Sequence, residues 1–419
     1  MESRSLLLLV LLLVACEPTP SGAPSDAGLP PPSADAGAPL GGKLDDFDVP
    51  DAGHPHPDAS PGGLDATSPA PTCVDSPPVR VSESGDFAQT ESRVAVAGDV
   101  VAVFWTDRTY AGSSDLRMRR FDRRTLAALG EPVTLADENL GDTTTFVPVG
   151  LRDSFVIAYD RAWGVSPTRA RVRGRMDRLG TDGARLEAWH LTEVGGIPVA
   201  IAANEDRLLF VGGYTPVMAR FLDTGAPDPE PAFRITPGRG ARGRTVAYDA
   251  MRDRWLMVFE GLGGGLVTQV IGEAMAPIPV SVGTAYLWAD LAVDDGGFGL
   301  VYQHAPGSAP WVTRFQRLDG DGAPIGAPRD IAEGRRHALA WSGHEHGVLI
   351  LGHGESPSLG LHFVDRDGEP IGRLAELGAV APDAPDVAWD GEARFLVSHT
   401  VDEGASHRYV ELRALCPPR

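Results

Sequence analysis

Seven short, almost continuously apolar segments recur along the chain, and this repetition constrains the fold more than any other feature. The segments end at Trp105, Tyr159, Gly212, Phe259, Tyr302, Leu351 and His399, so that successive ends lie 54, 53, 47, 43, 49 and 48 residues apart. A period of this size is typical of a supersecondary unit that buries its apolar face by stacking on the next copy. The repetition therefore predicts one array of seven similar units.

The units are predicted to be β rather than α. Each apolar segment is short, rich in Val, Phe, Trp and Tyr, and bounded by Gly, Asp or Pro. The turns that precede them, such as Asp294–Gly297 and Asp390–Glu392, supply Gly or Asp where a tight hairpin needs a positive φ. We expect four strands per unit, with the apolar segment as the second strand and buried on both faces.

A second turn recurs between the expected third and fourth strands. It reads Asp319-Gly320-Asp321-Gly322 in one unit and Asp365-Arg366-Asp367-Gly368 in the next. Asp-x-Asp-Gly invites a Ca²⁺ interpretation, because hard cations prefer several carboxylate oxygens. These loops lack the acidic residue that ends an EF-hand loop, so we interpret them as repeated hairpin turns and leave Ca²⁺ as the alternative.

The N-terminus has the features of an export signal. Leu6–Val14 is an apolar run after Arg4, too short to span a bilayer, which takes about 20 residues. The run ends in Leu13-Val14-Ala15-Cys16, which resembles the bacterial lipobox. That resemblance implies that residues 1–15 are a cleaved lipoprotein signal peptide and that Cys16 carries a diacylglyceryl group and an N-acyl chain such as palmitate. The alternative is an ordinary cleaved signal with an incidental Cys.

Residues 16–72 are predicted to be a disordered tether. They are Pro, Ala, Gly, Ser and Asp with almost no large apolar side chain, and residues 17–72 hold nine acids and one Lys. Such a stretch cannot bury enough surface to offset its ordering entropy. Glu17 follows Cys16 in place of an Asp, so the lipobox resemblance gives no inner-membrane retention signal, and the outer membrane is the expected location.

The chain ends are predicted to meet. The last unit lacks a fourth strand, and Pro78–Ser82 resembles the fourth strands at 132–135 and 279–282 but stands before the first unit. Adding it to the last unit would pair an open sheet edge. With Cys16 lipidated, Cys73 and Cys416 remain as an even pair in an exported chain, and we expect a disulfide between them. Two free or intermolecularly paired thiols are the alternative.

The predicted architecture resembles an all-β, seven-bladed β-propeller over residues 73–419, with six or eight blades as alternatives. More loosely, the chain resembles the lipid-anchored, Asp/Gly/Pro-tethered propeller lipoproteins of high-GC Gram-negative bacteria. It has no WD dipeptide signature, no kelch double glycine and no sialidase box. The resemblance therefore implies a fold and a location in the cell envelope, but no activity.

Charge and motifs narrow the possible functions. A net charge of −20 argues against nucleic-acid binding, which needs a basic footprint. The chain has no P-loop and no Gly-x-Ser-x-Gly elbow, and His344-Glu345-His346 lacks the His-Glu-x-x-His spacing of zinc proteases. We interpret His344–His346 as a solvated turn of the sixth unit and expect no cofactor or metal.

The loops after the second strands are expected to form one rim of the propeller, where ligands usually bind. The residues expected there are Asp107, Arg108, Asp160, Arg161, Trp163, Tyr214, Glu260, His304, His353, His399, Asp402 and Glu403. The leading hypothesis is a monomeric binding module for an envelope or extracellular protein or glycan. The alternative is an extracellular hydrolase or lyase acting on carbohydrate or ester, with paired rim acids or His as catalysts. Two carboxyls, or a His and a carboxylate, converging in one concave pocket would favour the enzyme.

Overall fold

In the computed structural model the chain divides into two compact units, Met1–Ser68 and Pro69–Arg419. The described residues all belong to the second unit, so the predicted signal peptide, Cys16 and the whole predicted tether lie outside them. The described ranges are 73–82, 88–108, 114–136, 145–163, 171–190, 198–204, 207–212, 218–223, 233–234, 242–260, 265–271, 277–280, 288–305, 310–334, 336–352, 357–381, 383–403 and 408–418. Within these ranges the secondary structure is all β, and no helix there is long and apolar enough to cross a membrane.

The described strands form seven antiparallel four-stranded sheets. Six of them are consecutive in sequence: β2 (Ala88–Ala97), β3 (Val100–Arg108), β4 (Ser114–Asp122) and β5 (Val133–Ala136); β6 (Phe146–Gly150), β7 (Ser154–Trp163), β8 (Arg171–Gly180) and β9 (Arg185–His190); β10 (Pro198–Ala203), β11 (Arg207–Gly212), β12 (Met218–Asp223) and β13 (Phe233–Arg234); β14 (Arg242–Asp249), β15 (Arg254–Glu260), β16 (Leu266–Ile271) and β17 (Ile278–Pro279); β18 (Ala289–Asp294), β19 (Gly297–His304), β20 (Val312–Leu318) and β21 (Pro324–Glu333); β22 (Arg336–Trp341), β23 (His346–Leu351), β24 (Ser358–Val364) and β25 (Ala375–Ala379). The last sheet joins β1 (Val79–Arg80) to β26 (Asp386–Trp389), β27 (Phe395–Asp402) and β28 (Arg408–Leu415) in the order β1-β28-β27-β26.

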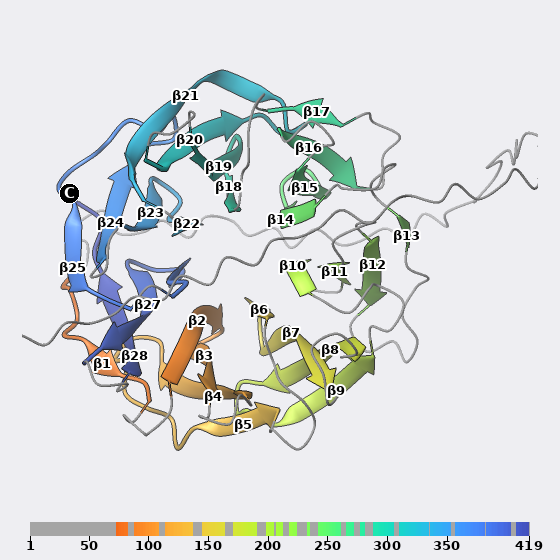
Figure 1. The fold of residues 1–419 in the computed structure, drawn as a ribbon, viewed down its shortest axis with the longest axis vertical. Coiled ribbons are helices and arrows are strands. Elements are labelled where there is room, and N and C mark those ends of the chain that lie inside the picture. Colours follow the sequence, from red (N-terminus) through yellow and green to blue (C-terminus); the bar gives the residue numbers. More distant parts are fainter. Residues whose placement is uncertain are drawn as a thin grey trace, which may run out of the picture. The chain divides into compact units, whose positions relative to one another are not determined.

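The sheets are arranged in a ring, as a propeller requires (Figure 1). The first strands β2, β6, β10, β14, β18, β22 and β26 line the middle, where each contacts the first strand of the next sheet, and β26 contacts β2. The predicted all-β propeller fold is therefore confirmed. All seven apolar segments are second strands, as predicted, and each lies between its first and third strand.

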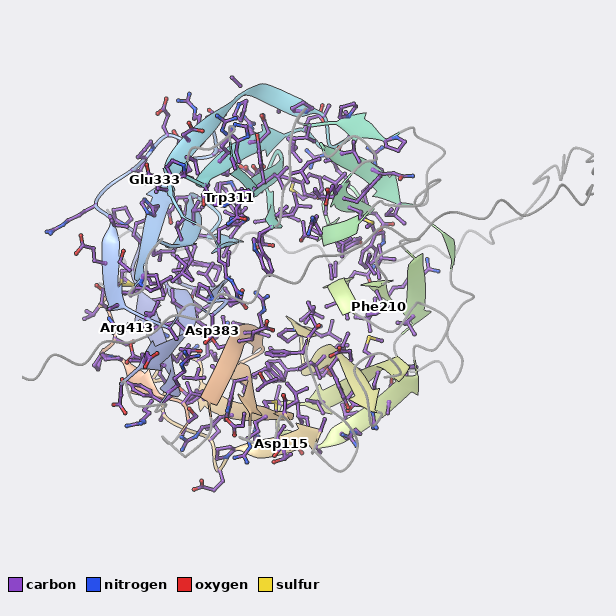
Figure 2. All side chains as sticks on the ribbon, viewed as in Figure 1. Asp115, Phe210, Trp311, Glu333, Asp383 and Arg413 are labelled. Carbon is purple, nitrogen blue, oxygen red and sulfur yellow. A yellow bond between two sulfur atoms is a disulfide. The ribbon has the colours of Figure 1, made fainter. Side chains whose placement is uncertain are left out.

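Apolar clusters fill the spaces between neighbouring sheets, which explains why the second strands are apolar on both faces. Val301 of β19 packs in one cluster with Val348 of β23, and Phe104 of β3 packs with Ile157 of β7 in another. Phe210 of β11 belongs to a third cluster and lies among the side chains that fill this region (Figure 2). The two faces of each second strand are thus covered by the two neighbouring sheets. Burial of this apolar surface stabilises the ring of sheets.

The two ends of the propeller domain meet in the last sheet. Val79 pairs with Leu412 and Arg80 with Glu411, so β1 supplies the fourth strand that the last unit lacks. The Cys73–Cys416 disulfide links the residues flanking these two strands, with Cα atoms 5.8 Å apart. Both the strand pairing and the disulfide were predicted from the sequence, and both are confirmed.

The Asp-x-Asp-Gly segments are hairpin turns. Asp319 Oδ1 accepts hydrogen bonds from the backbone N–H groups of Asp321 (2.9 Å) and Ala323 (2.8 Å), and Asp365 makes the same two bonds in the next sheet. Gly368 has a φ of +82°, and a Cβ there would lie 2.5 Å from the Phe315 ring of the preceding sheet. Glycine is therefore needed both for the turn and for the close approach of two sheets.

Candidate functional site

One level of the inner strands is polar around most of the ring. This level is defined by the residue of each first strand that pairs with the next-to-last residue of the apolar segment in the second strand. These residues are Arg93, Val147, Ala200, Thr245, Asp290, His337 and Asp386. Five consecutive sheets, from β14 round to β2, thus contribute a polar or charged side chain. The remaining two contribute Val147 and Ala200, which pack in apolar clusters between sheets, so this level is polar on one side of the ring and apolar on the other.

The two carboxylates at this level each connect neighbouring sheets. Asp386 of β26 accepts a hydrogen bond from the Val94 N–H of β2 (2.9 Å) and lies 3.7 Å from the Arg93 guanidinium. Asp290 of β18 accepts one from the Leu339 N–H of β22 (2.8 Å). These bonds join first strands of adjacent sheets, so both carboxylates serve the stability of the ring.

Burial dominates the ionisation of these groups. It is the main reason that the pKa of Asp386 is raised to about 6; the charge of Arg93 opposes the rise and the charge of Asp290 adds to it. Burial likewise raises the pKa of Asp290. Burial lowers the pKa of His337, which stands between them in the ring, to about 3, so this imidazole is neutral at physiological pH. A neutral His and backbone-bonded carboxylates fit a structural role better than proton transfer.

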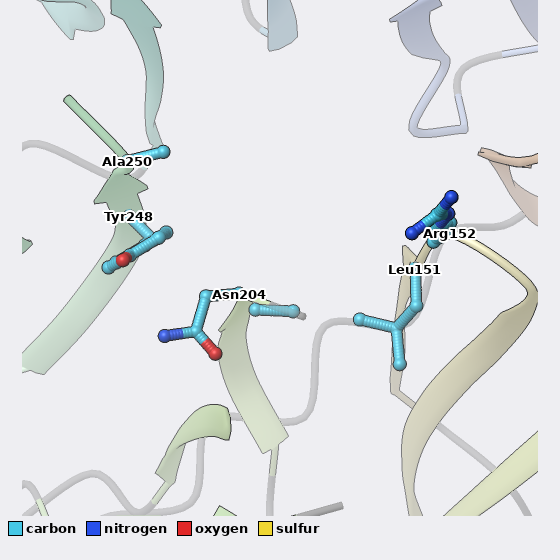
Figure 3. A pocket seen from close by; sticks show the side chains of 7 residues that line it. Leu151, Arg152, Asn204, Tyr248 and Ala250 are labelled. Atoms are coloured by element: carbon cyan, nitrogen blue, oxygen red, sulfur yellow. The ribbon is translucent and has the colours of Figure 1, made fainter. Parts of the chain in front are cut away.

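A cavity of about 630 Å³ opens beside three first hairpin turns (Figure 3). Its walls come from the β6–β7 turn, the β10–β11 turn and the β14–β15 turn, through Gly150, Leu151, Arg152, Ala203, Asn204, Tyr248 and Ala250. Figure 3 shows Tyr248 and Asn204 on one side and Leu151 and Arg152 across from them. The volume is that of a small-molecule site.

The polar wall of this cavity is held in place. The Tyr248 hydroxyl donates to Asp253 (2.7 Å), and its ring packs on Trp255 with the centroids 4.6 Å apart. Burial, with the Asp253 hydrogen bond second, raises the pKa of Tyr248, whereas the Asn204 amide beside the hydroxyl lowers it. Asn204 Oδ1 accepts the Arg207 N–H at 2.5 Å. Tyr248 and Asn204 therefore present a rigid aromatic and amide surface.

The predicted rim is only partly described. The loops between second and third strands lie outside the described ranges, and so do Tyr214, His353 and the side chains of Arg108, Arg161 and Trp163. Glu260 ends β15 and pairs with Arg244, His304 ends β19 half-buried with its pKa lowered by burial, and Asp402 ends β27 with Glu403 just beyond it.

Three rim predictions placed buried residues in exposed loops, and these placements are wrong. Asp107 lies within β3, accepts the Trp105 indole N–H (2.8 Å) and pairs with Arg117. Asp160 lies within β7 and accepts the Thr145 N–H (2.7 Å). His399 lies within β27, 1% exposed, and burial lowers its pKa to about 3. The second strands extend beyond their apolar segments, so the polar residues that follow still point into the protein.

The cavity at the first turns was missed by sequence reasoning. The sequence offers no clear signal for it, because these first turns carry Asp153, Asp206 and Asp249 just as the other first turns carry Asp or Gly. His344 and Glu345 lie in a first turn, as predicted, because β22 ends at Trp341 and β23 begins at His346. His346 itself is fully buried against Phe315 and Trp341, and no set of three metal-ligating side chains occurs among the described residues.

Comparison with solved structures supports the fold alone. A protein of unknown function from Dyadobacter fermentans DSM 18053 superposes with a TM-score of 0.52 at 10% identity, covering 81% of this chain and 98% of its own. A chain of the mitotic checkpoint complex superposes with a TM-score of 0.50 at 10% identity, covering 84% of this chain and 96% of its own. No family profile and no curated protein sequence matches the chain.

Proposed function

We propose that this protein is an exported, lipid-anchored β-propeller that binds a partner in the cell envelope or outside the cell. The observation that carries the proposal is the Cys73–Cys416 disulfide, which closes the whole domain. Disulfides of this structural kind form and persist in oxidising compartments. The apolar run and the Leu13–Cys16 motif point in the same direction and supply the anchor.

We infer that each of the seven sheets is one blade and that residues 16–72 hold this propeller away from the lipid surface. Glu17 after the acylated Cys16 favours the outer membrane over the inner one. The propeller would act as a monomer, because its own chain ends complete its last sheet. The Pro- and Asp-rich composition of the tether keeps it extended, which suits a module that must reach its partner.

Binding is favoured over catalysis by the composition of the cavity. Its described lining residues include one cation, one amide and one phenol, and neither a carboxylate nor a His is among them. Hydrolysis of glycosides or esters by acids and bases needs such groups within reach of the scissile bond. The described channel acids, Asp290 and Asp386, bond to backbone N–H groups instead. The hydrolase or lyase alternative would therefore depend on the rim loops.

The anchor can be tested by Cys16→Ser in the full chain expressed in a Gram-negative host. We expect wild-type protein to fractionate with outer membranes and to carry an acyl mass on Cys16, and the variant to lose both. Ser21→Ala is the matched control, since it changes a residue close to Cys16 without touching the lipobox or the disulfide. Full membrane partitioning of the Cys16 variant, together with an unacylated wild-type N-terminus, would overturn the proposal.

A further inference from the structure

We propose that the cavity formed by the β6–β7, β10–β11 and β14–β15 turns is a binding site for a carboxylate-bearing saccharide. This inference rests on the proposed binding function and names the chemical class of its ligand. It also moves the site from the predicted rim to the first hairpin turns, which lie at the opposite ends of the strands.

The cavity wall suits a sugar ring. Tyr248 offers an aromatic face kept rigid by Trp255, and Asn204 and the Tyr248 hydroxyl bring hydrogen-bonding groups to the same side. Leu151, Ala203 and Ala250 form small apolar surfaces between them. Pockets that combine an apolar lining with a few fixed polar groups orient small ligands specifically. Sugar rings carry apolar C–H faces and hydroxyl edges, which match this combination.

Arg152 supplies the preference for an anion. Its side chain is exposed at the cavity, and among the described residues it forms no ion pair. Two described acids of these turns have other partners. Asp153 pairs with Arg178 (3.5 Å), and Asp253 accepts the Tyr248 hydroxyl.

A free guanidinium in a concave site binds carboxylates in a planar, two-point geometry. In a chain of net charge −20 this local cation is what would admit an acidic ligand. A peptide carboxylate offers the same charge but lacks the sugar ring that would stack on the Tyr248 face. An acidic saccharide is therefore the ligand class that would contact the aromatic, polar and cationic groups of the cavity together.

The experiment titrates the purified full chain with trigalacturonic acid and with its methyl ester, which has the same rings but no charge, by isothermal calorimetry. We expect the acid to bind at least about tenfold more tightly than the ester. Arg152→Gln should remove that difference while leaving ester binding unchanged. Arg373→Gln is the matched control, because Arg373 is also exposed but lies between β24 and β25, away from the cavity.

Two outcomes would overturn the inference: no binding of the acid, or equal binding of it by wild type and Arg152→Gln. Preferential binding of an acidic tripeptide that competes at the same site would overturn the saccharide class. Tyr248→Phe keeps the ring and loses the hydroxyl, so it should weaken binding of acid and ester alike. None of these outcomes bears on the acylation of Cys16, so failure here is distinguishable from failure of the anchored-protein proposal.

Discussion

Two junctions between sheets show different ways of holding a ring together. The closing junction joins the last sheet, β26–β28 with β1, to β2–β5, and the continuous junction joins β18–β21 to β22–β25. Both have an apolar cluster between second strands and a channel carboxylate bonded to the next inner strand. The last sheet, which forms one side of the closing junction, also contains a disulfide and a strand from the other end of the chain.

Each junction has an arginine at the equivalent turn position, and the contacts of the two arginines can be compared directly. Arg123, after β4, donates to the Asp390 carbonyl (3.0 Å) and pairs with Glu392 (2.6 Å) across the closing junction. Arg366, after β24, pairs with Asp294 (3.4 Å) and Asp295 (3.3 Å) across the continuous one. Asp294 is 1% exposed, whereas the Glu392 side chain is 44% exposed. The two arginines therefore reach carboxylates of different exposure across their junctions.

The largest effect we expect comes from removing the Cys73–Cys416 disulfide. Cys73→Ser together with Cys416→Ser should lower the free energy of unfolding by up to about 5–6 kcal/mol, because the disulfide closes a loop with a sequence separation of 343 residues. Urea denaturation monitored by tryptophan fluorescence measures the change. Reductant should destabilise the wild type but leave the double variant unaffected. Free thiols at both positions in periplasmic protein would refute closure by disulfide.

The next effect compares the channel carboxylates. Because burial raises the pKa of Asp386 to about 6, the folded state keeps a proton that the unfolded state loses above about 4. The free energy of unfolding of the wild type should therefore fall as the pH rises from about 4 to about 6. The fall is at most about 3 kcal/mol, and screening by solvent reduces it.

Asp386→Asn removes this titration. As the pH rises from 4 to 7, the free energy of unfolding of the variant should increase relative to that of the wild type. Asp290→Asn at the continuous junction should act in the same direction, since burial raises that pKa too. Buried His337 and His399 have the opposite slope, but they are common to all three proteins and cancel in the differences. Parallel pH profiles would show that Asp386 is ionised throughout.

The smallest effect tests the arginine pair. Arg366→Ala strands a buried carboxylate and should cost about 2 kcal/mol, whereas Arg123→Ala breaks mainly an exposed ion pair and a backbone bond and should cost about 1 kcal/mol. Thermal unfolding of both variants with the disulfide intact gives the order. An equal or larger loss at Arg123 would mean that burial of the paired carboxylate does not set the strength of these contacts.

The elements that sequence reasoning found are those with a local chemical signature. The seven apolar segments, the Asp-x-Asp-Gly turns and the unpaired Pro78–Ser82 strand each follow from composition at a fixed place in the repeat. The even cysteine pair gave the disulfide for the same reason.

The candidate site was harder to predict because it depends on where strands end and which turns meet. Asp107 and His399 were placed in loops because polarity was taken as the end of a strand, yet Trp105 and neighbouring strands provide buried partners there. Tyr248, Asn204 and Arg152 come from three different units, about 50 residues apart along the chain. The sequence repeat does not predict that they share one cavity, because these turns come together only when the ring forms.

The disulfide also determines how the domain would carry mechanical load. Any pull on the chain N-terminal to Cys73 reaches the sulfur bridge before it reaches β1. The ladder pairs of β1 with β28 are Val79 with Leu412 and Arg80 with Glu411, and the N–H groups of Ser76 and Val81 add hydrogen bonds to the carbonyls of Ala414 and Val410. Force therefore passes into Cys416 and the end of β28 through a covalent bond, and the short β1 strand is spared. Without the bridge, the same pull would peel β1 from the ring one residue pair at a time.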